Sequence, residues 1–499
     1  MRARAFPLGT FLLATWATPA AAQLISIRTV PISQSHQFDL FPSLRGAMGG
    51  VSLAVDDSLH DPFGNPAKGA RLGASRFFGS PGVYSVSSGA GAGRSLPLGA
   101  WVRSGRWFGG AAVAFQQIDL SENTNPIFPL SCPACDARGG IELPAADRTQ
   151  GNAFGYALLG MTLPGTGLSL GASLSWAGLH AVDGVDLLYP GSVRLRQNGH
   201  SLDLRVGALK QWQGDRALSA VVLHNRFAST HDVFYLDSFW DPGTQQFAQR
   251  PRPEQNLDHT NTWGAQVEYT HPLPEPGWRM GWVATTNLMS HPKIPNYEIQ
   301  NIPRDPGNSE AFNLGVGVSK SDASSTVALD LLYQPIWSYT WADAAAPITT
   351  SRGSTIPAGG KTIENRFRFS NALLRLGFAQ DMAFDEATKA VGLQLGLAVH
   401  RIDYSLVQDD NVQVRTRRQN EDWIEWTPTW GLSLRFPAWE LRYRGSVTHG
   451  TGRPGVQSGN DFAVPAAEAG TILVAPSGPL TLTGVKVMTH QVAIVFPFR

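Results

Sequence analysis

Short motifs in the sequence carry residue types that could do catalysis, but each lacks the surroundings that the chemistry needs. Residues 167–171 read Gly-Leu-Ser-Leu-Gly, which has the letters of a nucleophile elbow. The elbow needs a strand, a sharp turn and a helix, whereas this stretch begins an alternating strand after a turn. Residues 359–362 read Gly-Gly-Lys-Thr, but Thr355 stands where a phosphate-binding loop has its first glycine. The 12 histidines are scattered without His-Glu-x-x-His spacing. We therefore predict no enzyme, no cofactor and no metal site.

Cys132 and Cys135 are the two cysteines of the chain and are separated by two residues. A zinc site would need about two further ligands, and neither a second cysteine pair nor a nearby histidine supplies them. Redox chemistry of the thioredoxin type would need a βαβ context, which is absent. In an exported chain, oxidising conditions favour a small disulfide loop between the two residues.

The N-terminus predicts export. Residues 1–22 combine Arg2 and Arg4, an apolar run from Phe6 to Ala17 and an Ala-Ala-Ala end, which is typical of a cleaved signal peptide. The apolar run is shorter than the roughly 20 residues of a spanning helix. After Gln23 no run of apolar residues is long enough to span a membrane as a helix.

The composition excludes several classes of protein. The 499 residues are 16% charged and 42% hydrophobic, with 52 glycines and 15 tryptophans. A disordered chain is rich in charge and poor in aromatic residues, and this chain is the reverse. The net charge of +1 leaves no positive excess for phosphates, so we expect no nucleic-acid partner. Low charge with a mean hydropathy of only −0.13 predicts strands that are apolar on one face and polar on the other.

Period-2 alternation is clear in several segments. Trp439, Leu441 and Tyr443 alternate with Glu440, Arg442 and Arg444. Ile424, Trp426 and Trp430 share the face opposite Glu425, which is the pattern of a β-strand. The predicted strands are 76–88, 96–103, 107–120, 152–163, 169–182, 201–213, 217–234, 262–271, 279–291, 311–319, 325–339, 366–381, 390–404, 424–436, 438–449 and 485–498.

The connections between these strands are alternately short and long. The predicted long ones are 121–151, 183–200, 235–261, 292–310, 340–365, 405–423 and 450–484. Long loops on one side and short turns on the other are typical of outer-membrane barrels. Only a closed sheet can cross lipid as strands, because lipid offers no partner for backbone polar groups. We therefore predict an all-β, antiparallel transmembrane barrel of about 14–16 strands, formed by residues 73–499, in the outer membrane of a Gram-negative-type cell and in contact with its lipid.

Residues 38–72 precede the first strand and are unlike it. They are too rich in glycine for a helix and lack strand alternation, so we expect them to lie in or under the lumen. Asn65 precedes Pro66 and should be extended. An Asn-Pro-Ala step here is either a rigid turn that links this stretch to the barrel or a turn that gates ligand passage.

This stretch resembles the N-terminal signature of the FadL-like outer-membrane transport proteins, and its details look more like the PorV/PorQ branch of that family. The matching residues are Gly46, Gly49, Gly50, Ala54, Asp56, Asp57, Asn65, Pro66 and Ala67. The resemblance implies an N-terminal plug, or hatch, over residues 23–72 and passive transport of hydrophobic small molecules. The PorV-like alternative is a binding or shuttle protein for secreted cargo of a type IX secretion system. A structural barrel with a closed plug is the third reading.

The resemblance also implies that a kink in the third strand opens a lateral window. Here that strand is 107–120, with Gly109 and Gly110 at the possible opening. Its outward face shifts from Val113 and Phe115 to Ile118 and Leu120, which predicts a bulge. For transport of hydrophobic molecules we expect an apolar pocket beside the plug.

Alternation also assigns charged residues to the lumen. They are expected to pair across strands, as the polar interior of a barrel requires, or to hold the plug in place. These residues are Asp203, Arg205, Asp330, Arg366, Arg368, Glu425, Arg435, Glu440, Arg442 and Arg444.

Overall fold

The computed structural model describes residues 37–89, 91–120, 149–182, 194–291, 307–344, 346–385, 389–454 and 482–498. Within these ranges no helix has both the length and the hydropathy to cross a membrane. The predicted signal peptide, residues 1–22, and the cysteine pair, Cys132 and Cys135, lie outside them.

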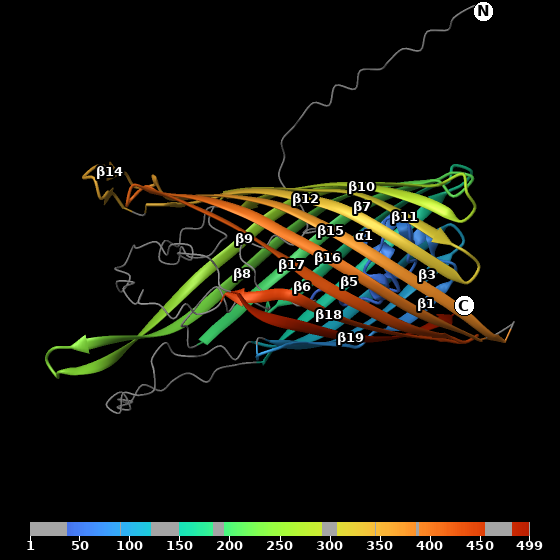
Figure 1. Cartoon of the computed structure of the whole chain (residues 1–499), viewed down its shortest axis with the longest axis horizontal. Helices are drawn as coiled ribbons and strands as arrows, with labels where there is room; N and C mark the ends of the chain where they lie inside the picture. Colours follow the sequence, from blue (N-terminus) through green and yellow to red (C-terminus); the bar gives the residue numbers. More distant parts are fainter. Residues whose placement is uncertain are drawn as a thin grey trace, which may run out of the picture.

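Antiparallel strands form one closed ring (Figure 1). The first half comprises β1 (Ser75–Gly79), β2 (Gly82–Val86), β3 (Ala92–Ser104), β4 (Trp107–Asp119), β5 (Thr149–Leu163), β6 (Leu168–Leu179), β7 (Arg194–Gln211), β8 (Ala217–Asp241) and β9 (Gln246–Pro272). The second half comprises β10 (Trp278–His291), β11 (Gly307–Ser321), β12 (Ser325–Asp343), β15 (Lys361–Asp385), β16 (Lys389–Asp410), β17 (Arg415–Arg435), β18 (Glu440–Pro454) and β19 (Leu482–Phe498). A separate hairpin joins β13 (Ile348–Thr349) and β14 (Thr355–Ile356).

The ring has sixteen positions. Both β1 and β2 lie between β3 and β19, so together they occupy one position, and their pairing with β19 closes the barrel. The interruption falls at Ser80 and Pro81, because proline has no N–H to donate to a neighbour. The predicted antiparallel barrel is therefore confirmed, at the upper end of the predicted range of strands.

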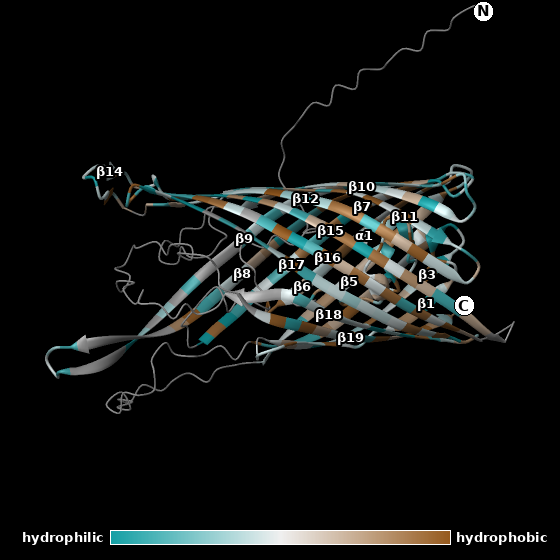
Figure 2. Cartoon of the chain, viewed as in Figure 1, coloured by the Kyte–Doolittle hydropathy of each residue, from teal (hydrophilic) through white to brown (hydrophobic). Residues whose placement is uncertain are grey.

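Large apolar side chains point outward around the ring. Phe115, Val206 and Leu395 are 62%, 64% and 58% exposed, each on the face opposite buried neighbours. Figure 2 shows hydrophobic positions recurring along strands of the ring such as β7, β11 and β15. This is the exterior that alternation predicts for a barrel surrounded by lipid.

Several strands extend farther than the sequence predicts. β8 and β9 pair as far as Asp241 and Gln246, so most of the predicted loop 235–261 is strand. β12, β15, β16 and β17 likewise run into the predicted loops 340–365 and 405–423. These ends project on the side opposite the short turns (Figure 1). Alternation weakens here because a strand outside lipid has no need of an apolar outer face.

The bulge predicted in strand β4 is absent. Its pairs with β3 and β5 run from Trp107 to Asp119 without a shift of register. Ile118 is completely buried on the inner face, where the sequence analysis expected an outward residue. The prediction was wrong because an apolar side chain was assigned to lipid, whereas Ile118 packs in an apolar cluster with Tyr84 and Val487.

Residues Gln37–Leu72, here called the N-terminal segment, lie inside the ring (Figure 1). The segment contains η1 (Arg45–Met48), α1 (Asp61–Gly64) and η2 (Pro66–Arg71). These short helices correct the expectation that the stretch is non-helical. Pro62 and Pro66 stand at the first turns of α1 and η2, where a missing N–H costs nothing.

Candidate functional site

The N-terminal segment runs lengthwise through the lumen. At its beginning, Gln37 donates a hydrogen bond to the Ala181 carbonyl (2.8 Å) and another to Gln116 of β4 (3.2 Å), near the projecting ends of the strands. Its end at Leu72 leads into β1 on the side of the short turns. Between these points η1 packs against β15 to β18, and η2 packs against β4 to β8. The segment therefore touches nearly opposite parts of the wall.

Glycines in the wall make room for the segment. A Cβ atom added to Gly396 would lie 2.0 Å from the Gly49 nitrogen, and one added to Gly281 would lie 1.9 Å from the Leu53 oxygen. Since these contacts are with backbone, a side chain there would displace the segment. The shape of the inner wall is therefore complementary to the backbone of the segment at these two glycines.

Two glycines of the FadL-like signature form the turn that follows η1. Gly49 and Gly50 have positive φ values of 69° and 78°, a conformation that favours glycine. The Gly49 amide donates to Thr429 Oγ1 of β17, and the same hydroxyl donates to the Ala47 carbonyl, both at 2.8 Å. Gly46 lies against Arg444, so that a Cβ would meet the guanidinium group.

Asp57 organises the segment internally. Its carboxylate accepts from the Leu44 amide (2.8 Å), from the Ser43 hydroxyl (3.1 Å) and from the Leu59 amide (3.2 Å). Burial alone would raise the pKa of Asp57, but the Arg45 and Arg442 guanidinium groups outweigh it and hold that pKa below its usual range. The side chain is therefore a buried carboxylate that joins two stretches of the segment.

Ion pairs join the segment to the wall. Lys68 lies 2.5 Å from Glu268 of β9, and Asp56 lies 2.6 Å from Arg279 of β10. Asp56 also pairs with Arg71 within the segment. The sequence analysis singled out Asp56 but missed Glu268 and Arg279. The alternation of Val267 and Tyr269 with Glu268 could have placed Glu268 in the lumen.

The Asn-Pro-Ala step begins η2 inside the lumen. Asn65 is extended, as expected, with φ −126° and ψ 112°. Its side chain accepts from the Ala67 amide (3.0 Å) and donates to the Ala220 carbonyl of β8 (3.1 Å), while Ala67 is completely buried. The step is a helix start fastened to the wall, rather than the direct link from the segment to the first strand.

Eight of the ten predicted lumen charges face inward. Three of them bind the segment: Asp330 accepts from the Ser52 amide (2.6 Å), Arg205 donates to the Phe63 carbonyl (3.1 Å), and Arg444 pairs with Asp39. The others pair mainly within the wall. These contacts are Arg205–Asp203 (2.7 Å), Arg442–Glu440 (2.9 Å), Arg435–Asp381 (2.7 Å) and Glu425–His400 (3.7 Å).

Arg366 and Arg368 were assigned wrongly. Both lie on the outer face of β15, whereas Phe367 and Phe369 between them are buried inside. Arg366 pairs with Asp409 at 2.5 Å on that outer face. The prediction assumed that phenylalanine faces lipid, but this part of β15 lies in the projecting region, and the interior there is apolar.

The ladder is continuous at Gly109 and Gly110. Gly109 pairs with Val102 and Leu159, and Gly110 pairs with Trp101 and Leu158. In this structure the wall therefore has no gap at the position suggested for a lateral opening.

Two apolar clusters line the inner wall on the side of the projecting strands. One consists of Ala311, Ile336, Phe367, Phe369, Ile402 and Leu406, with Trp423 beside it; we call it the β12–β16 cluster. The other contains Tyr84, Val86, Ile118, Ala181, Val485 and Val487. Because barrel interiors are normally polar, these clusters are the least expected feature of the lumen.

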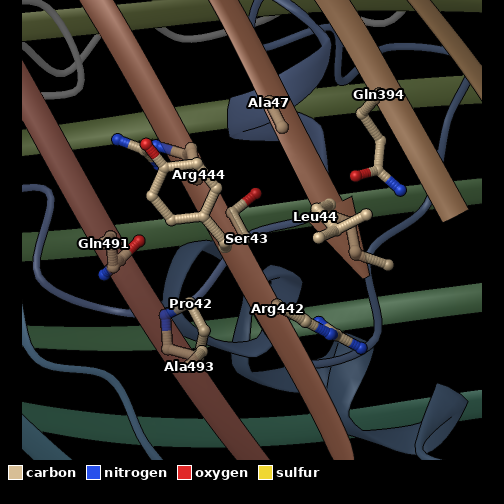
Figure 3. Close-up of a pocket in the computed structure, with 11 residues that line it drawn as sticks. Pro42, Ser43, Leu44, Ala47, Gln394, Arg442, Arg444, Gln491 and Ala493 are labelled. Carbon is tan, nitrogen blue, oxygen red and sulfur yellow. The ribbon is translucent and has the colours of Figure 1, made fainter. Parts of the chain in front are cut away.

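A small pocket lies between the segment and strands β16 to β19 (Figure 3). Its lining includes the charged side chains Arg442 and Arg444 and the amides of Gln394 and Gln491, beside Pro42. This pocket differs from the apolar pocket that the sequence analysis expects beside the segment. Among the described residues, no group of three histidine, cysteine, aspartate or glutamate side chains is arranged to hold a metal ion.

Together these features define a class: a closed, sixteen-stranded antiparallel barrel with an apolar exterior and a lumen occupied by its own N-terminal segment. No family model matches the sequence, and no curated protein matches it.

Several solved structures are similar to this chain over most of its length, at low sequence identity. A FadL homologue from Pseudomonas aeruginosa is similar at a TM-score of 0.43 and 11% identity, over 92% of this chain and 99% of that one. A bacterial polysaccharide outer membrane secretin has a TM-score of 0.38 and 6% identity, over 85% of this chain and 99% of that one. CdiB from Acinetobacter baumannii has a TM-score of 0.39 and 9% identity, over 85% of this chain and 60% of that one.

Proposed function

We propose that this protein is an outer-membrane barrel that lets hydrophobic small molecules cross passively, with the N-terminal segment as its plug. The proposal includes export through a cleaved signal peptide and assigns no catalytic role. The closed ladder supports a membrane location, because every strand has a neighbour on both sides. The exposed apolar side chains of its outer face support the same location.

The β12–β16 cluster is the observation that carries the transport proposal. Ile336, Phe369 and Ile402 come from three neighbouring strands and all face the lumen. Each is at most 1% exposed, so the apolar side chains pack together there. A channel for hydrophilic solutes would have polar residues there. An apolar inner wall lowers the free energy of a hydrophobic molecule that leaves water.

The contacts of the N-terminal segment support a plug. Hydrogen bonds or ion pairs join it to β7, β9, β10, β12, β17 and β18, among other strands. Passage therefore requires part of the segment to move while the ring stays intact. Since the wall is paired at Gly109, the route we propose begins in the lumen rather than at that strand.

Uptake in intact Gram-negative cells tests the proposal. Cells that express the protein should take up the hydrophobic dye N-phenyl-1-naphthylamine faster than cells without it. The Ile336→Asn/Phe369→Asn variant should lose most of this gain, and Ile336→Val, which keeps the wall apolar, should retain it. Equal uptake by the double variant, at equal amounts of folded barrel, would contradict the proposal.

The projecting strands favour a second candidate function. A tilted strand needs about 9–11 residues to cross a membrane, and β8 and β9 have 25 and 27. A long paired extension is suited to holding a protein partner, as the PorV-like reading requires. Co-purification of secreted cargo with the wild type, but not with a variant that has a shortened β8–β9 hairpin, would support it. Recovery of equal cargo with both would argue against it.

A further inference from the structure

A row of uncharged, hydrogen-bonding side chains crosses five consecutive strands of the inner wall. Gln266 of β9 pairs with Thr285 of β10, and Thr285 pairs with Asn313 of β11. The register of β11 on β12 sets Asn313 opposite Gln334, which pairs with Asn371 of β15. Neighbouring strands are about 4.8 Å apart, so this amide row spans about 19 Å.

Several amide groups in and beside the row lack partners. Both side-chain polar atoms of Asn287, one step farther along β10, are buried without a hydrogen bond in the described part of the chain. The same holds for the Oδ1 atoms of Asn313 and Asn371. Asn287 and Asn371 are only 2% and 4% exposed. Buried amides without partners are unfavourable, and in native proteins they call for an explanation such as a functional role or a bound water or ion.

The backbone is interrupted at the same place. Asn313 and Phe312 are not paired with β12, opposite Pro335, although the register is identical on either side of the gap. Asn371 and its neighbour Ser370 are likewise not paired with β16. Proline has no N–H, which explains the first gap. The amide row therefore lies where backbone groups of β11 and β15 are not paired with the neighbouring strand.

Apolar surfaces border the row on both sides. Toward the projecting ends lie Ala311, Ile336 and Phe369 of the β12–β16 cluster. Toward the N-terminal segment lie Val283 and Leu332, packed against Leu53 of the segment. A molecule that contacts the row would therefore also contact hydrocarbon.

No member of the row carries a charge, and the carboxylate in contact with it, Glu268, accepts a hydrogen bond from the Gln266 side chain (2.5 Å). In the next step outward, Asn287, Ala311, Ile336 and Phe369 are uncharged as well. One step toward the segment, Glu268 is already paired with Lys68 at 2.5 Å. A charged ligand would lose its hydration here without gaining a counter-ion, which disfavours it strongly.

We propose that the amide row and the β12–β16 cluster form a binding site for an uncharged amphipathic molecule, with its hydroxyl or amide groups on the row and its apolar body on the cluster. This inference rests on the proposed function, and it narrows the transported class from hydrophobic molecules in general to neutral ones with a polar end. The polar end would point toward the N-terminal segment, because the row is the part of the site nearest to it.

Calorimetry on the full chain in lipid nanodiscs tests the site with three defined probes. p-Nitrophenyl β-glucoside has neutral hydroxyls on an aromatic body, p-nitrophenyl phosphate has the same body with a charge, and glucose lacks the body. We expect the glucoside to bind at least tenfold more tightly than either of the others. Absence of glucoside binding, or equal binding of the phosphate, would overturn the proposal.

Variants separate binding from a structural role. Asn287→Leu and Asn371→Leu should each weaken glucoside binding about fivefold, the effect of one hydrogen bond. Asn225→Leu is the matched control, since Asn225 also lies on the wall but already donates to Ser201 at 2.9 Å. Because the Asn287 amide has no partner, Asn287→Leu should leave the thermal stability of the barrel unchanged or higher. A loss of stability with unchanged binding would assign these residues a structural role and overturn the site.

The outcomes distinguish this proposal from the one on which it rests. Dye uptake without glucoside binding would remove the amide site and leave transport of hydrophobic molecules standing. Glucoside binding without dye uptake would keep the site and refute transport.

Discussion

At the scale of single residues, a few buried charges hold the N-terminal segment in shape. Asp57 accepts hydrogen bonds from Ser43 and Leu44 before η1 and from Leu59 before α1. One carboxylate thus joins parts of the segment that are about fifteen positions apart in sequence. A neutral amide in its place would both donate and accept, so it could not serve three donors equally well.

The lowered pKa of Asp57 makes the segment sensitive to acid. The folded-state pKa lies below the unfolded value, so the stabilisation is complete above the unfolded value, near 3.8, and is lost as pH falls through the folded value. We expect amide protection in the segment to fall in two stages as the pH decreases. The first lies below about pH 6.5, because burial lowers the pKa of His60 and disfavours its protonated form, and the second lies below about pH 4, where Asp57 becomes protonated. In Asp57→Asn, protection at pH 7 should drop by about 2 kcal/mol, and the decline below about pH 4 should become smaller. Hydrogen exchange measures both; an unchanged acid profile in the variant would contradict the role of Asp57.

The Lys68–Glu268 pair predicts a non-additive effect. Removing one partner leaves the other buried and unpaired, which typically costs about 3 kcal/mol, whereas replacing both with apolar residues is close to neutral. Lys68→Met and Glu268→Leu should therefore each loosen the segment, and the double variant should recover most of the loss. Protease protection of the segment is the measurement. Additive losses would show that the two side chains do not interact.

Prediction of residue roles succeeded where lipid imposes the pattern and failed elsewhere. Asp330, Arg442 and Arg444 were placed inside correctly because their neighbours face lipid. Arg366 and Arg368 were assigned to the lumen but lie on the outer face, because β15 continues beyond the region where outward residues must be apolar. The wall partners of Asp56 and Lys68 could not be derived from spacing, since they lie 223 and 200 positions away in the sequence.

At the scale of elements, the glycines of the wall set where the segment can lie. Gly396→Ala would place a methyl group 2.0 Å from the Gly49 nitrogen and should displace η1 without disturbing the strand ladder. Gly155→Ala is the matched control, because a Cβ there has no atom within 4 Å. Cysteine labelling of Ala47→Cys should become fast in Gly396→Ala and stay slow in Gly155→Ala. Equal labelling in both would show that η1 does not depend on this contact.

The order of the strands could be predicted from sequence, and their number to within the range 14–16, because alternation survives in each segment that forms the barrel wall. The lengths of β8 and β9 could not, since pairing continues into residues 235–261 without an apolar face. The three short helices were missed because glycine content argues against long helices, whereas η1 and α1 each need only four residues and η2 only six.

At the scale of the whole molecule, the barrel combines three surfaces: an apolar exterior, a lumen filled by the N-terminal segment, and apolar clusters on the inner wall. A channel for hydrophilic solutes would share the apolar exterior but have an open lumen lined by polar side chains. The combination fits the route that we propose for hydrophobic molecules, because an apolar inner surface favours their contact with hydrocarbon over contact with water.

The selectivity of the barrel in intact cells tests this account most directly. Uptake of N-phenyl-1-naphthylamine is measured beside entry of a hydrophilic cephalosporin that a periplasmic β-lactamase hydrolyses. The account predicts that the wild-type protein accelerates dye uptake and leaves cephalosporin entry at the rate of cells without it, and that Gly396→Ala raises cephalosporin entry. Rapid cephalosporin entry through the wild-type protein, or no acceleration of dye uptake, would contradict it.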